Sequence, residues 1–94
     1  MVNIALYSFP MNPEIKKGIY QHYKGNKYEV MGVARHSETR EALVVYKALY
    51  ETEFGNDSLW VRPIKMFMET VTVNGKTVPR FLYLNAKFEE GSQP

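Results

Sequence analysis

Turn-forming residues divide this chain into short stretches, and their close spacing constrains the fold more than any other feature of the sequence. Asn74-Gly75, between residues 71–73 and 77–84, is the strongest short signal for a β-hairpin. Lys24-Gly25-Asn26-Lys27 is a second turn, because glycine and asparagine tolerate positive φ. No stretch between turns is long enough to form a helix that covers a sheet. A sheet without such a cover must hide its own face, which favours a small barrel.

The stretches between the turns are rich in aromatic and β-branched residues, which is typical of strands. We expect five or six short strands, at residues 18–23, 28–34, 43–50, 59–62, 71–73 and 77–84. Gly32, inside the second of these, predicts a bulge or a sharp bend. One or two short helical turns are expected as well, over residues 37–42 with Ser37 as the cap and over residues 63–68. The predicted fold class is therefore mainly β.

The length of the chain suits a single domain. Ninety-four residues leave no room for a second core, and a hydrophobic content of 45% argues against intrinsic disorder. We expect one β-barrel domain over residues 17–88, an N-terminal arm or edge strand over residues 1–16, and a polar tail over residues 89–94.

Composition excludes several classes of function. The chain has no cysteine, which rules out disulfides, thiolate catalysis and cysteine-type zinc sites. It has no apolar run of the roughly 18 residues that a membrane span requires, and its first residues do not resemble a signal peptide, so a cytoplasmic location is expected. A net charge of +2 does not by itself predict strong binding to a phosphate backbone.

Two histidines supply the residues that most resemble a catalytic or metal site. His22 and His36 are the only histidines, and Glu38 lies two residues after the second. Together they are conceivable as a metal site or an acid–base site, but nothing in their spacing fixes them near one another, so structural histidines are the favoured interpretation. Ser37 is a sequence neighbour of both His36 and Glu38, which disfavours a catalytic relay among the three. No metal or cofactor is predicted.

Aromatic and cationic side chains recur together, and they suggest a binding surface. Trp60 and Arg62 are two residues apart on one predicted strand and therefore share a face. An arginine beside an aromatic ring can clamp a flat ligand or pair with an anion, or pack internally as a cation–π contact. Leu59 and Val61 are assigned to the core. The helical turn after this strand is expected to contribute further core residues, Met66 and Phe67.

Taken together, these clusters resemble a known family. The chain resembles a bacterial domain-of-unknown-function family, number sixteen fifty-three, in collinear clusters at His22-Tyr23-Lys24-Gly25-Asn26, Tyr28, His36-Ser37-Glu38-Thr39, Val44-Val45-Tyr46, Leu49-Tyr50, Leu59-Trp60-Val61-Arg62-Pro63, Met66-Phe67 and Pro79-Arg80-Phe81. The resemblance implies a small SH3-like β-barrel or roll, in agreement with the strand count. It implies no activity, because none is settled for the family.

We expect a non-enzymatic binding module that uses an aromatic and cationic face. The candidate ligand-binding residues are His22, Tyr23, His36, Glu38, Trp60 and Arg62. A small hydrolase or nucleotide-processing enzyme with a histidine–glutamate site is a less favoured alternative, and a structural or oligomerisation unit is another. The partner is open among a protein, a nucleotide and a nucleic acid, and homodimerisation through an edge strand or the N-terminal arm is a further alternative. No membrane partner is expected.

Overall fold

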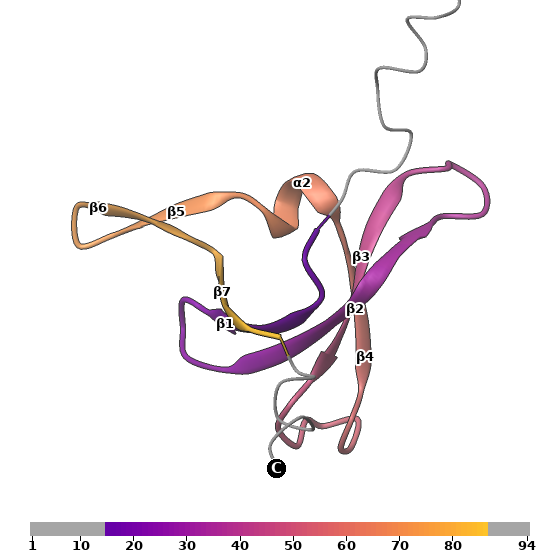
Figure 1. Cartoon of the computed structure of the whole chain (residues 1–94), viewed down its shortest axis with the longest axis horizontal. Helices are drawn as coiled ribbons and strands as arrows, with labels where there is room; N and C mark the ends of the chain where they lie inside the picture. Colours follow the sequence, from indigo (N-terminus) through magenta and orange to yellow (C-terminus); the bar gives the residue numbers. More distant parts are fainter. Residues whose placement is uncertain (1–14, 87–94) are drawn as a thin grey trace, which may run out of the picture.

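The computed structural model describes residues 15–86 and is mainly β, as predicted (Figure 1). The elements in chain order are β1 (Gly18–His22), β2 (Lys27–Arg35), β3 (Ala42–Ala48), β4 (Leu59–Pro63), α2 (Ile64–Phe67), β5 (Thr70–Val73), β6 (Lys76–Pro79) and β7 (Phe81–Asn85). The predicted tail, and all of the predicted arm except residues 15 and 16, lie outside the described residues. Within residues 15–86, no helix is long and apolar enough to cross a membrane.

Five strands form one antiparallel sheet, and the remaining two form a separate hairpin. The order in the sheet is β4-β3-β2-β1-β7, and β5 pairs only with β6. Figure 1 shows the sheet curling around α2, with the β5–β6 hairpin reaching away from it. The hydrogen bonding among the described strands does not close into a barrel, because β4 and β7 are both edges. The sheet is thus an open roll, and the SH3-like topology stays a prediction.

A bulge inside β2 and the turn between β2 and β3 determine how these two strands pair. The register between them shifts between Val30 and Gly32, which confirms the predicted bulge. The connection that follows is a turn rather than the helical turn expected over residues 37–42. His36, not Ser37, provides the side-chain cap: its Nδ1 accepts the backbone N–H of Glu38 at 3.1 Å. Arg40 then adopts a φ of 68°, which ends any helical continuation.

The core is an aromatic cluster on the concave face of the sheet. Alternate side chains of β3 are buried, as its apolar pattern predicts, at Ala42, Val44, Tyr46 and Ala48. Phe67 of α2 is 2% exposed and stacks on Phe81 of β7, with their ring centroids 4.1 Å apart. Met66, which was also expected in the core, is 44% exposed. A single helical turn directs one side chain onto the sheet, and here that side chain is Phe67.

The side chains of β4 face the opposite way from the sequence prediction. Leu59 and Val61 were assigned to the core but are 62% and 58% exposed. Val61 pairs with Val45, whereas Trp60 pairs with the buried Tyr46, so the alternate residues of β4 face the concave side. Trp60 and Arg62 do share a face, and it is the face that carries the core.

Candidate functional site

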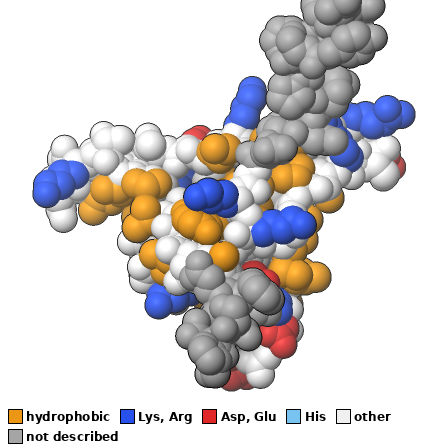
Figure 2. Space-filling model, in the orientation of Figure 1, with side chains coloured by type: hydrophobic (Ala, Val, Ile, Leu, Met, Phe, Trp, Pro, Cys, Tyr) orange, Lys and Arg blue, Asp and Glu red, His pale blue; other side chains and the backbone are white. Residues whose placement is uncertain are grey.

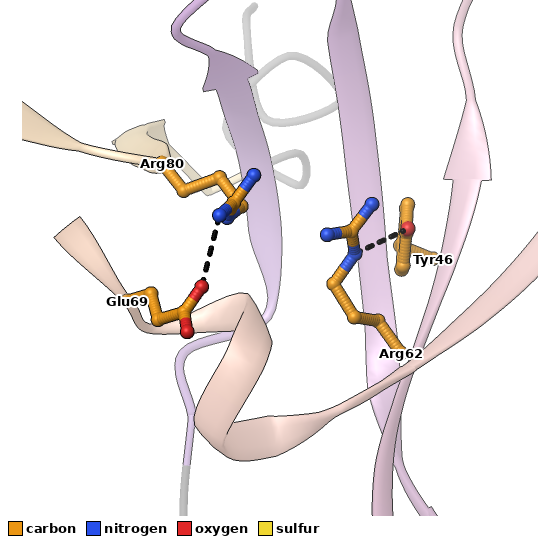
Figure 3. Close-up of polar contacts among 4 residues, drawn as sticks. All are labelled: Tyr46, Arg62, Glu69 and Arg80. Atoms are coloured by element: carbon orange, nitrogen blue, oxygen red, sulfur yellow. Dashed lines mark hydrogen bonds and ion pairs between the residues drawn. The ribbon is translucent and has the colours of Figure 1, made fainter. Parts of the chain in front are cut away.

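Arg62 lies on the concave face of the sheet and has no charged partner among the described residues. Its Nε donates a hydrogen bond to the Tyr46 hydroxyl at 3.3 Å, and its guanidinium lies over the Phe81 ring, 5.6 Å from the centroid (Figure 3). No carboxylate within residues 15–86 lies within ion-pair distance of it. The two contacts fix the position of the guanidinium and leave its charge unneutralised, which is a feature of anion-binding arginines.

Arg80 approaches the same region from the junction of β6 and β7. Its Nη2 pairs with Glu69 Oε1 at 2.9 Å, and its backbone N–H donates to the Glu69 carbonyl at 2.9 Å. These contacts close the base of the β5–β6 hairpin. The Arg80 Nε is buried and has no hydrogen-bond partner within the described part of the chain. Arg80 therefore keeps donor capacity that Glu69 does not use.

His22 lies beside both arginines at the end of β1. It pairs across the sheet with Phe81, and the two ring centroids are 4.9 Å apart. Its Nδ1 accepts the backbone N–H of Lys24 at 3.1 Å, so the neutral ring carries its proton on Nε2. Partial burial, followed by the charges of Arg62, Arg80 and Lys24, lowers the pKa of His22 below its usual value. His22 is therefore a neutral donor in a positive environment.

We call Arg62, Arg80, His22, Tyr46 and Phe81 together the arginine site. Figure 3 shows the guanidinium groups of Arg62 and Arg80 directed into the same space in front of the sheet. Within residues 15–86, Glu69 is the one carboxylate in an ion pair with either arginine, and its partner is Arg80. The chemistry that this arrangement favours is the binding of an anion, with the aromatic rings as its floor.

The remaining predicted residues lie elsewhere. His36 and Glu38 are in the turn at the far end of β2 from His22, and the nine residues of β2 separate the two ends by roughly 25 Å. The structure therefore does not bring the two histidines together. Within the described ranges, no three acidic or histidine side chains converge as metal ligands. Trp60 is on the same face as Arg62, but its Nε1 donates to Ser58 Oγ at 3.2 Å.

Arg80 is the member of the arginine site that the sequence does not predict. In the sequence, Arg80 stands out only as part of the Pro79-Arg80-Phe81 cluster that resembles the family. Its position beside His22 depends on the pairing of β1 with β7, two strands that are about 60 residues apart in the chain. No local pattern in the sequence reports such a pairing.

A groove lies between the β5–β6 hairpin and the end of the sheet formed by β1, the turn after it and β7. Its volume is about 610 Å³, and its lining residues include Tyr23, Val73, Lys76, Val78 and Leu82. Leu82 and Phe81 are neighbours on β7 and point to opposite faces of the sheet. Leu82 lines the groove and Phe81 belongs to the arginine site, so the two sites are neighbours at β7. His22 also lines the groove, and its ring contacts that of Tyr23, with centroids 4.6 Å apart.

These features define a small antiparallel β domain with two neighbouring arginines on its concave face and a groove beside them, with His22 common to both. A family model described as a protein of unknown function, DUF1653, matches residues 18–83, and the chain belongs to this family. The chain is similar to the crystal structure of a DUF1653 protein from Bordetella bronchiseptica, with 38% sequence identity and a TM-score of 0.70. The alignment covers 77% of this chain and 90% of that one. No curated protein matches the chain.

Proposed function

We propose that this domain is a non-enzymatic binding module that takes an anionic ligand at the arginine site. The observation that carries the proposal is the Arg62 guanidinium, held by Tyr46 and Phe81 and without a carboxylate partner in the described chain. The proposal places the module in residues 17–88 and in the bacterial cytoplasm. It keeps the predicted roles of His22 and Arg62 and adds Arg80.

Electrostatics supports an anion over a neutral ligand. Two guanidinium groups that share one region repel each other, and Glu69 offsets only one of the two charges. Glu69 is itself 48% exposed, so solvent screens its pair with Arg80 and an incoming anion competes with it for that arginine. A phosphate or carboxylate matches the planar donor fork of arginine, so these are the ligand groups that we assign to the site.

Geometry favours binding over catalysis. A histidine–glutamate enzyme needs His22, His36 and Glu38 at one place, and β2 holds His22 apart from the other two. A structural or oligomerisation unit is favoured by the exposed apolar side chains of β4, Leu59 and Val61. Light scattering at high protein concentration tests that second candidate, because a monomer contradicts it.

The experiment that tests the proposal is a calorimetric titration of the full chain with inorganic phosphate at low ionic strength. Arg62→Gln is expected to abolish binding. Glu69→Gln is expected to tighten binding by about two- to fivefold, because it frees Arg80 from a screened ion pair. Lys17→Gln, which removes one exposed positive charge near Gly32, is the matched control and is expected to bind like the wild type.

The two variants at the site are expected to move affinity in opposite directions. A nonspecific charge effect has the same two signs, because one variant removes a positive charge and the other a negative charge, so the comparison that identifies the site is Arg62→Gln with Lys17→Gln. Arg62→Gln and Lys17→Gln both remove one positive charge, so equal losses from the two contradict the proposal. Binding by Arg62→Gln at wild-type affinity also contradicts it. Dispersed amide spectra of each variant establish that the fold is retained.

A further inference from the structure

The β5–β6 hairpin has one apolar and one polar face. Val71 pairs with Val78 and Val73 pairs with Lys76, so these four side chains lie on the same face of the ribbon. The opposite face carries Pro79 and three threonines, Thr70, Thr72 and Thr77. Of these four, only Pro79 lines the groove. Val73, Lys76 and Val78 line the groove, which therefore runs along the apolar face. Figure 2 shows hydrophobic side chains gathered along the hairpin.

Both walls of the groove expose apolar surface. The hairpin is fastened at its base, where Arg80 bonds to Glu69, and its valine face is turned toward the groove. Val73 is 36% exposed, and across the groove Tyr23 is 38% and Leu82 51% exposed. An isolated two-stranded ribbon is marginal in water and gains stability when its apolar face is covered. The groove thus has two facing apolar walls that a ligand of matching thickness would cover.

The charge of the lining selects the kind of ligand. Lys76 is the cation that lines the groove, and no aspartate or glutamate lines it. The Gln21 amide uses one of its donors within the protein, because its Nε2 donates to the Gly25 carbonyl at 2.9 Å. A volume of about 610 Å³ is within the range of small-molecule sites. A ligand with an apolar body and one acidic group complements both the walls and the cation.

We propose that the groove between β7 and the β5–β6 hairpin binds a small amphipathic organic anion, with its apolar body between Val78 and Leu82 and its acidic group at Lys76. This goes beyond the proposed function, because Lys76, Val78 and Leu82 are not part of the arginine site, and only His22 is common to the two sites. The ligand body is a flat ring, since Val78, Leu82 and the Tyr23 ring line the groove. His22 and Asn74 are further polar groups of the lining.

The test is a ¹⁵N NMR titration of the full chain with indole-3-acetate and with its neutral analogue, indole-3-acetamide. The acetate is expected to bind about two- to fivefold more tightly and to shift the amides of Val78, Leu82 and Tyr23. Lys76→Gln is expected to make the two affinities equal without changing the walls. Val78→Asp is expected to abolish binding of the acetate, whereas Thr77→Asp adds the same charge to the opposite face and retains it.

Three outcomes overturn the inference. These outcomes are equal wild-type affinities for the two compounds, binding of the acetate to Val78→Asp at wild-type strength, and loss of binding in Thr77→Asp. If the acetate shifts only the Arg62 and Arg80 side chains, the groove proposal fails and the arginine site stands. If the groove amides shift while phosphate does not bind at Arg62, the groove proposal stands without the proposed function. Lys76→Gln keeps the test decisive if Val78→Asp does not fold.

Discussion

Replacement of Phe67 by alanine is expected to remove the side chain on which the concave core depends. Phe67 is 2% exposed, stacks on Phe81 at 4.1 Å, and makes further ring contacts with Tyr20 and Tyr46, at 5.4 Å each. The loss combines the transfer free energy of a buried ring with the cavity left behind, about 3–5 kcal/mol in total. A domain of this size has a total stability of only about 5–10 kcal/mol, so the variant is expected to be close to unfolding.

The assay is urea denaturation monitored by tryptophan fluorescence, with Met66→Ala as the matched control from the same helical turn. Met66 is 44% exposed, and its replacement is expected to cost less than about 1 kcal/mol. Phe67→Leu, which keeps more of the buried volume, gives a measurable intermediate if the alanine variant does not fold. A cost below about 1.5 kcal/mol for Phe67→Ala, or equal costs for Phe67→Ala and Met66→Ala, would refute the account of the core.

Three further predictions concern the site and the backbone. Because folding lowers the pKa of His22 from 6.5, the neutral ring contributes stability that is complete above pH 6.5 and is lost as the pH falls through the pKa of the folded state. His22→Gln should therefore make the free energy of unfolding depend less on pH between pH 7.5 and about 5. Gly18→Ala is expected to destabilise the domain more than Gly25→Ala in urea titrations. Both residues have positive φ, but only at Gly18 would the new Cβ lie 2.6 Å from a backbone carbonyl oxygen. Equal costs for the two variants would contradict this prediction. Tyr46→Phe, which removes the hydrogen-bond acceptor of the β4 arginine, is expected to cost about 0.5–1.5 kcal/mol by the same measurement.

The local pattern predicted individual strands but not how they are arranged. The alternation in β3 and the turn at Asn74-Gly75 are properties of adjacent residues, and both elements form as expected. The assignment of Leu59 and Val61 to the core was wrong because a four-residue stretch with apolar side chains on both faces does not reveal which face is buried. Closure of the barrel depends on which strands become edges, and that is a long-range property.

The candidate site was partly predictable for the same reason. His22 and Arg62 were chosen because polar and aromatic residues occur together near turns, and the sheet brings both side chains beside Phe81. His36 was chosen on the same grounds, but the length of β2 separates it from His22. The place of Arg80 in the site is not predictable from local sequence, because only the nonlocal pairing of β1 with β7 brings it beside His22.

The most direct test of the central claim is an NMR titration of the wild-type chain with inorganic phosphate that follows the arginine side-chain Nε–H signals. The account predicts saturable shifts of Arg62 and Arg80, with Arg40 in the β2–β3 turn as an internal reference that does not move. Shifts of Arg62 and Arg80 no larger than that of Arg40, or shifts that rise linearly with phosphate, would contradict an anion site at these arginines.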